Sequence, residues 1–321
     1  MLSRAADTCF WLSRYIERAE NTARILDVNM QLLLDYDTHA SDAGKHHWQP
    51  LLASLEAQEL FAKLFDRIDA ETVMQFLTFE KQNPNSIISS ICDARENART
   101  IREQISSSMW EHLNRLYLYL QSPSAKSDFL GSPHDFYRRV VEGSHLFQGV
   151  TDATMSHSEG WQFIQVGKYV ERADNTSRLL DIKYHILLPS GEQVGGVVDL
   201  TQWMAVLRSC SAIEAHLKAT GGTLTPWNVA EFLILDDAFP RSIRFCVDQM
   251  DEGLREIGGG TRGAFRNEVE RISGILRSNL DFANIDQVYD CGLHEFLDGI
   301  QLQLIEITAA MTKEYCVWLA E

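Results

Sequence analysis

A helical stretch that the chain contains twice constrains its fold more than any other feature. Residues 15–27 read Tyr-Ile-Glu-Arg-Ala-Glu-Asn-Thr-Ala-Arg-Ile-Leu-Asp, and residues 169–181 read Tyr-Val-Glu-Arg-Ala-Asp-Asn-Thr-Ser-Arg-Leu-Leu-Asp. Nine of the thirteen positions are identical at an offset of 154, and the other four differ by conservative changes. The repeat predicts a duplicated helical unit.

Each copy of the motif has an apolar face and a polar face. With 3.6 residues per turn, the apolar positions of the first copy form a stripe typical of a core-facing helix. These positions are Leu12, Ile16, Ala19, Ala23 and Leu26. The polar stripe of the first copy consists of Arg14, Glu17, Asn21 and Arg24, with Arg18 at its edge. The polar stripe of the second copy consists of Lys168, Glu171, Asn175 and Arg178, with Arg172 beside it.

These repeated polar stripes have three interpretations. A single charged stripe is usually a solvated helix face, but a solvated face accepts almost any polar residue. The same Glu, Arg and Asn in both copies therefore indicate a geometric constraint. The stripes form either a buried network between the halves or a ligand site, because Arg and Asn beside a carboxylate can bind a carboxylate or phosphate.

The rest of the chain predicts an all-α fold, because strand-like alternation is almost absent. In the first half we expect helices at 4–36, 48–65, 70–80, 84–120 and 135–150. The second half repeats this order at offsets of 155 or 156, and 297–319 forms the last helix. We expect Gly258-Gly259-Gly260 to split the long helix in the second half only. The prediction is one domain, 1–321, a pseudo-twofold bundle of about ten helices with halves 1–154 and 155–321.

A basic stripe in the first half is missing from the second. Arg95, Arg99 and Arg102 lie about one turn apart, beside Glu96 and Asn97. The aligned positions of the second half lack the cations at 95 and 102. If the protein has a site, we therefore expect it to be asymmetric, with the first half supplying most cations. A solvated face is the alternative interpretation.

Composition limits the classes of partner and compartment. The net charge of −16 argues against nucleic acid and against an anionic membrane surface. Six scattered cysteines without a CxxC pair, and an amphipathic helix that begins near Met1, predict a reduced, cytoplasmic protein without a signal peptide. No phosphate loop and no nucleophile elbow occur, and we expect no cofactor and no metal.

The segment between the halves contains one candidate proton shuttle. His157 lies shortly before the second copy of the motif, within reach of Glu171 and Arg172 if the chain turns there. A helix-start loop capped by Ser158 is the alternative.

Taken together, these motifs resemble the alpha-E family of bacterial all-helical proteins, which is named for a Glu-Arg motif. The Glu-Arg positions correspond to Glu17, Arg18, Glu171 and Arg172, and a middle motif to Arg95, Glu96 and Asn97. The resemblance covers essentially the whole chain. It implies a role in peptide or amide ligation with an ATP-grasp ligase as partner, because alpha-E domains stand alone or are fused to such a domain. This chain has no ATP-grasp region of its own, so we expect no ATP site of that type.

Three functional hypotheses follow. The first is a non-catalytic or co-catalytic subunit that binds a carboxylate-bearing amino acid or peptide, or the ligase itself, through both polar stripes and the basic stripe. The second is an acyl-transfer or amide-forming enzyme with Glu17 or Glu171 as base and His157 as proton shuttle. The third is a structural protein locked by buried ion pairs. Binding and catalysis require an open pocket with unpaired arginines, whereas the structural hypothesis requires paired arginines and no adjoining cavity.

Overall fold

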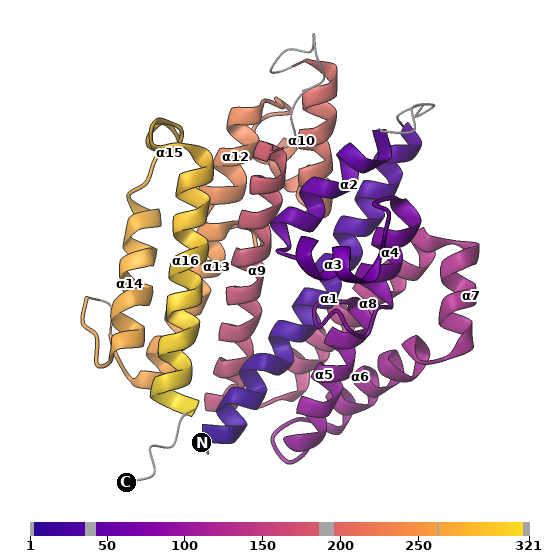
Figure 1. Cartoon of the computed structure of the whole chain (residues 1–321). Coiled ribbons are helices and arrows are strands. Elements are labelled where there is room, and N and C mark those ends of the chain that lie inside the picture. The colour runs from indigo at the N-terminus through magenta and orange to yellow at the C-terminus, as the bar shows by residue number, and fades with distance from the viewer. Residues whose placement is uncertain (1–2, 36–42, 186–195, 262, 317–321) are drawn as a thin grey trace.

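The computed structural model describes residues 3–35, 43–185, 196–261 and 263–316, and these contain helices and no strands (Figure 1). The first eight α-helices are α1 Ser3–Asp35, α2 Ala43–Ser54, α3 Gln58–Leu64, α4 Ala70–Thr78, α5 Ile87–Thr100, α6 Ser107–Leu120, α7 Pro123–Gly131 and α8 Pro133–Thr154. The next eight are α9 Glu159–His185, α10 Val197–Ser209, α11 Ile213–Ala219, α12 Pro226–Leu235, α13 Ile243–Gly258, α14 Glu268–Asp281, α15 Ile285–Cys291 and α16 Leu293–Met311. A π-helical turn, Thr312–Cys316, follows. The all-α prediction is confirmed.

The predicted number of about ten helices is too low, because several predicted helices are broken. The helix expected at 48–65 is α2 and α3, with Glu56 in the left-handed region between them at φ 52°. The helix expected at 84–120 is α5 and α6, and the hydroxyl of Ser106 caps α6. A break in the long helix thus occurs in both halves, not only at 258–260. The last helix ends at Met311, and residues 317–319 lie outside the described residues.

Helices α1 and α9 form the centre of the molecule and pack closely against each other (Figure 1). Helix α1 also packs against α5 and α8, and α9 packs against α13 and α16. Gly167 of α9 faces α1 so closely that a Cβ atom there would lie 2.3 Å from the carbonyl oxygen of Phe10. Nearby, the hydroxyl of Ser13 donates to the carbonyl of Ile164 at 2.7 Å. The two helices therefore meet almost backbone to backbone.

One cluster of buried apolar side chains fills both halves. It extends from Ala6 of α1 to Met311 of α16, and it contains the whole apolar stripe predicted for the first motif. A separate small cluster consists of Val28, Leu32 and Ala205. The core is thus shared along the chain. The pseudo-twofold duplication and its halves, 1–154 and 155–321, stay a prediction.

Two serine caps precede the helices that pack on α1 and α9, and the residue before each cap differs between the two. Ser86 caps α5 and Ser242 caps α13, each by accepting a hydrogen bond from the backbone N–H three residues later. The residue before each cap is Asn85 in one case and Arg241 in the other. A short neutral side chain therefore stands beside α1 and α9 at one place, and a long cationic side chain at the other.

Candidate functional site

The two Glu-Arg motifs exchange partners across the contact between α1 and α9. Glu17 Oε1 and Oε2 accept hydrogen bonds from Arg172 Nε and Nη2 at 2.7 and 2.8 Å. Glu171 Oε1 and Oε2 accept from Arg18 Nε and Nη2 at 2.6 and 3.0 Å. Both glutamates are buried, with 0% and 2% of their surface exposed. Two bidentate pairs of this kind fix the register and crossing of the helices, because each fork accepts only one planar geometry.

Each buried glutamate contacts a second arginine, but the two arginines come from different places. Arg14 of α1 donates from Nε to Glu171 Oε2 at 2.7 Å. Arg241, in the turn before α13, donates from Nη1 to Glu17 Oε1 at 3.0 Å and to Asn21 Oδ1 at 3.2 Å. The side around Glu17 is therefore closed by a side chain from the distant turn.

A second carboxylate one turn along each helix shows the same asymmetry. Glu20 accepts from Arg24 at 2.8 Å and also from the Arg241 guanidinium, and Ser144 donates to it at 2.6 Å. Asp174 stands at the corresponding position of α9, and its ion partner is Arg178 at 2.8 Å. Among the described residues, no second cation contacts the Asp174 carboxylate.

The difference between positions 85 and 241 opens a pocket at this place. Asn85 is too short to repeat the contacts of Arg241, and its Oδ1 instead accepts from Arg18 Nη1 at 2.8 Å. A cavity of about 300 Å³ lies beside it. Its polar lining is Arg14, Arg18, Thr22, Glu56, Asn83, Asn85, Glu171, Asp174, Asn175 and Arg178. We call this cavity the Asp174 pocket.

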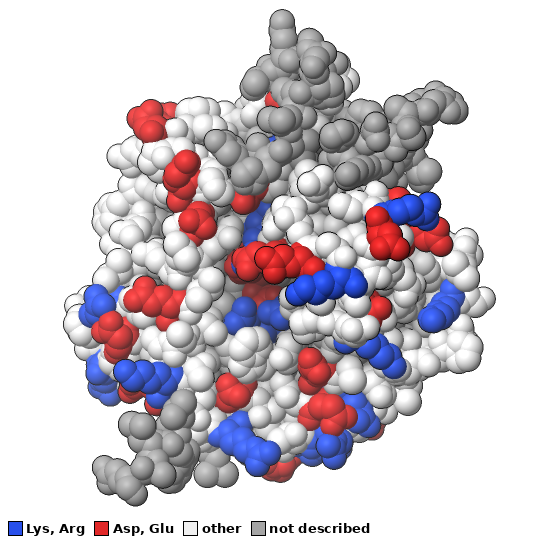
Figure 2. Space-filling view, viewed as in Figure 1, with Lys and Arg blue, Asp and Glu red and all other residues white. Residues whose placement is uncertain are grey.

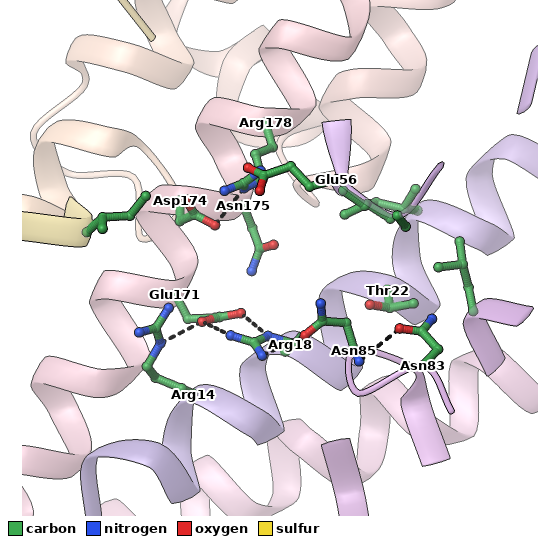
Figure 3. Close-up of a pocket in the computed structure, with 15 residues that line it drawn as sticks. Arg14, Arg18, Thr22, Glu56, Asn83, Asn85, Glu171, Asp174, Asn175 and Arg178 are labelled. Carbon is green, nitrogen blue, oxygen red and sulfur yellow. Dashed lines mark hydrogen bonds and ion pairs between the residues drawn. The ribbon is translucent and has the colours of Figure 1, made fainter. Parts of the chain in front are cut away.

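Figure 3 shows the Asp174 pocket between two groups of charged side chains. Glu171, Arg14 and Arg18 form one side, and Asp174, Arg178 and Glu56 form the other. In the space-filling view, acidic and basic side chains gather at a hollow near the middle of the face shown (Figure 2). The pocket is therefore lined by both signs of charge.

Asn175 projects into the space between these two groups (Figure 3). Its Nδ2 atom is buried without a hydrogen-bond partner, and no described donor reaches its Oδ1. The corresponding Asn21 also has an unpartnered Nδ2, but its Oδ1 accepts from Arg241. The unfilled acceptor at Asn175 is thus a feature of the open side.

The pKa shifts of three carboxylates follow the number of described arginines that contact each one. Burial raises the pKa of Glu171, but Arg18 and Arg14 outweigh burial and hold it at about 2. Burial likewise opposes the charge of Glu20, whose pKa nevertheless lies well below the usual range because Arg241 stands beside it. Burial raises the pKa of Asp174, and Arg178 offsets this only in part. Of the three carboxylates, Asp174 is the one that contacts a single described arginine instead of two.

The same pKa shifts argue against Glu17 and Glu171 as catalytic bases. Burial opposes the charge of Glu17, but Arg172 and Arg241 hold its pKa below the usual value. A general base works best when its pKa lies near the working pH. A carboxylate held ionised by two arginines is a weak base, and its oxygens are already occupied by the guanidinium groups.

The structure places the other predicted site residues away from the Asp174 pocket. Arg95 and Arg99 contact Glu96 at the surface of α5, and the Arg95 and Arg102 guanidinium groups each lie 5.3 Å from the ring centre of Trp110. Asn97 lies partly exposed on the same helix. This basic stripe is a surface packed on aromatic rings and does not line the pocket.

His157 and Lys168 also lie outside the pocket. The His157 ring stacks on Trp161 and bonds to Asp152, so no contact joins it to Glu171 in the described chain. The proton-shuttle role of His157 stays a prediction without a supporting contact. Lys168 lines a different cavity, together with Gln148, and pairs with no carboxylate of the described residues.

Sequence reasoning missed the residues that complete the network. Glu20 and Asp174 occupy the same position of the repeated motif, and a change from Glu to Asp is too conservative to indicate a role. Asn85 and Arg241 lie in two aligned Pro-x-Ser segments, 84–86 and 240–242, whose proline and serine indicate only the start of a helix. The signal that could have found them was the change from Asn to Arg between two otherwise corresponding turns.

The described residues give no sign of a metal centre or a membrane span. No three of their His, Cys, Asp and Glu side chains are grouped so that they could hold a metal ion. None of the described helices combines the length and the apolar character that crossing a bilayer requires.

The fold and the site define an all-α protein in which two Glu-Arg motifs exchange partners between central helices. The chain belongs to the Alpha-E family, described as a predicted alpha-helical domain with a conserved ER motif, and the match covers residues 1–316.

Two curated relatives are uncharacterized proteins of Mycobacterium bovis and Mycobacterium tuberculosis. Each is 25% identical to this chain over 96% of it and over 36% of its own length. The chain therefore spans about a third of the length of these relatives. No solved structure matches the chain.

Proposed function

We propose that the chain is a binding module whose Asp174 pocket takes an amino acid or the end of a peptide. The observation that carries this proposal is the replacement of Arg241 by Asn85 on the open side. On the closed side, a guanidinium group fills the space between two carboxylates and an asparagine. On the open side, the corresponding acceptors border a cavity.

The ammonium group of the ligand takes the place of the missing guanidinium. Arg241 contacts Glu17, Asn21 and Glu20, and the corresponding groups in the pocket are Glu171, Asn175 and Asp174. A buried carboxylate is stabilised by an opposite charge within about 4–6 Å. A primary ammonium beside Asp174 supplies that charge and can also donate to the free Oδ1 of Asn175.

The carboxylate group of the ligand is bound by the arginines of the same pocket. Arg14 donates to Glu171 only through Nε, so its two terminal nitrogens retain donors. Three arginines and three acidic residues line the cavity, namely Arg14, Arg18, Arg178, Glu56, Glu171 and Asp174. A lining that is neutral overall but carries both charges suits a ligand that is itself a zwitterion.

We further propose that the two halves are a pseudo-twofold duplication. One half of the network contains the Arg241 cation, and the other contains the Asp174 pocket at the corresponding place. The offsets of 154 to 156 between corresponding residues support this, as do the matching partners of α1 and α9. The structural hypothesis then applies to the closed side and the binding hypothesis to the open side.

The partner that we propose is a ligase of the ATP-grasp type, for which this chain is an accessory or substrate-binding component in the cytoplasm. The family resemblance supports the partner, and a ligand with an ammonium and a carboxylate is the kind of molecule that an amide-forming ligase joins. Six free cysteines support a reducing compartment.

The test uses calorimetric titration with single amino acids and dipeptides, and a variant that closes the pocket from within. Asn85→Arg places a guanidinium where Arg241 stands on the other side. We expect it to abolish ligand binding while the melting temperature stays equal or rises. The matched control is Asn97→Arg, which adds the same charge on α5 outside the pocket and should bind as the wild type does.

Two outcomes would contradict the proposal. Binding that persists in Asn85→Arg places the ligand elsewhere. If neither amino acids nor dipeptides bind the wild type, the pocket does not take this class of ligand.

A further inference from the structure

A second cavity borders α1, α8, α9 and α13 and shares no lining residue with the Asp174 pocket. Its volume is about 340 Å³. The residues that matter for its chemistry are Gln148, Asp152, Trp161, Gln165, Lys168 and Tyr169. We call it the Lys168 pocket.

Lys168 occupies the position of α9 that corresponds to Arg14 of α1, but it has lost the contact that Arg14 makes. Arg14 binds Glu171, whereas the oxygens of Glu17 accept from Arg172, Arg241 and the Gln148 amide. Within the described chain, no carboxylate lies within ion-pair distance of the Lys168 ammonium. The group rests instead over the Tyr169 ring, 4.3 Å from its centre.

Two further polar groups beside Lys168 also lack partners. The Gln165 side chain is only 8% exposed, and its amide makes no hydrogen bond to a described residue. The Trp161 Nε1 atom is buried and unpartnered. A buried donor without a partner costs about 1–3 kcal/mol. Trp161 Nε1 bears this cost. Together with the Gln165 amide and the Lys168 ammonium at the same cavity, it indicates that an acceptor from outside completes the site.

The electrostatics of the cavity agree with this geometry. Burial and the neighbouring Arg172 lower the pKa of Lys168 to about 8, against the weaker opposing effects of Glu17, Asp152 and Cys246. An added anion would restore the usual preference for the charged ammonium.

We propose that the Lys168 pocket binds the carboxylate of a small organic acid through Lys168, Gln165 and Trp161. One ammonium and two neutral N–H donors match a single negative charge, and Asp152 at the cavity disfavours a doubly charged anion. Trp161, Tyr169, Ile16 and Phe147 also line the cavity and provide apolar surface for the remainder of the ligand. This site does not depend on the function proposed for the Asp174 pocket.

The first test measures how fast Lys168 is methylated by formaldehyde and cyanoborohydride, with peptide mass spectrometry as readout. Butyrate is the probe, and butyramide is its neutral match. At ten times its dissociation constant, butyrate should slow the modification of Lys168 about tenfold. Exposed Lys63 and the buried Lys183, which pairs with Asp199 at 2.7 Å, serve as internal controls and should not change.

The second test measures butyrate binding by calorimetry in Lys168→Met and Gln165→Leu. Both variants should lose binding at least about tenfold, the equivalent of 1.4 kcal/mol, whereas Asn85→Arg should bind butyrate as the wild type does. Three results would overturn the proposal: equal protection of Lys168 by butyramide, equal protection by inorganic phosphate, or unchanged butyrate affinity in Lys168→Met. The methylation test uses the wild type, so it decides even if a variant fails to fold.

Discussion

Removing the charge of Glu17 tests whether the exchanged pairs hold α1 and α9 together. Glu17→Gln keeps the shape of the side chain but leaves Arg172 and Arg241 with one buried negative charge fewer. Breaking a buried ion pair on one side costs roughly 3–5 kcal/mol. An unfolding entropy of about 2.1 cal/mol/K per residue then predicts a fall in melting temperature of about 4–7 °C for a chain of this length.

The matched control is Glu96→Gln on the surface of α5. Glu96 also contacts two arginines, Arg95 and Arg99, but its side chain is 44% exposed. Exposed pairs contribute about 0–1 kcal/mol, so the melting temperature should fall by no more than about 1–2 °C. Differential scanning calorimetry of both variants and the wild type decides. If Glu17→Gln melts within a degree of Glu96→Gln, the buried exchange does not stabilise the fold as argued.

Three further predictions follow from other contacts. The pKa of Glu171 is held at about 2 against an ordinary 4.5, so its contribution to stability is full above pH 4.5 and is lost as the pH falls towards 2. The stability of Glu171→Gln should therefore depend less on pH between 4.5 and 2 than that of the wild type, as measured by acid denaturation followed by circular dichroism. The hydrogen bond from His294 to Asp181 raises the histidine pKa above 6.5. The stabilisation that His294 contributes to folding is therefore full below pH 6.5 and is lost as the pH rises through the raised pKa. Urea denaturation should show a larger stability difference between wild type and His294→Gln at pH 6 than at pH 8.5. Gly167→Ala should destabilise the protein by about 1–3 kcal/mol, because the added Cβ atom would meet the backbone of α1. Gly149→Ala, in α8, has open space around the added Cβ atom and should stabilise the protein by up to about 1 kcal/mol in the same urea assay.

The apolar side of the fold could be predicted from the sequence, and its polar side only in part. The stripe that includes Leu12, Ile16 and Ala23 is buried as its periodicity indicated. The same periodicity does not show whether a charged stripe faces water or a second charged stripe. Glu17 and Glu171 are buried because α1 and α9 each cover the other's stripe, a fact that depends on tertiary packing.

Local sequence patterns do not predict all of the helix breaks or the observed asymmetry of the site. The helix break before Ser106 contains no glycine or proline, so the capping serine is its only local sequence signal. Arg241 reaches Glu17 across 224 positions of sequence, and no local pattern indicates that contact. Asymmetry itself was predicted, but from Arg95 and Arg102, which contact the surface ring of Trp110 instead of a pocket.

The exchange between the motifs also sets an order of events during synthesis. Glu17 and Arg172 are 155 positions apart, so α1 leaves the ribosome long before α9 exists. Contacts so distant in sequence form late, because a long loop must close first. Until then the Glu17 carboxylate lacks its arginine partners, Arg172 and Arg241, and stays hydrated. Because burying an unpaired carboxylate is costly, this face of α1 disfavours apolar contacts while the rest of the chain is still being made.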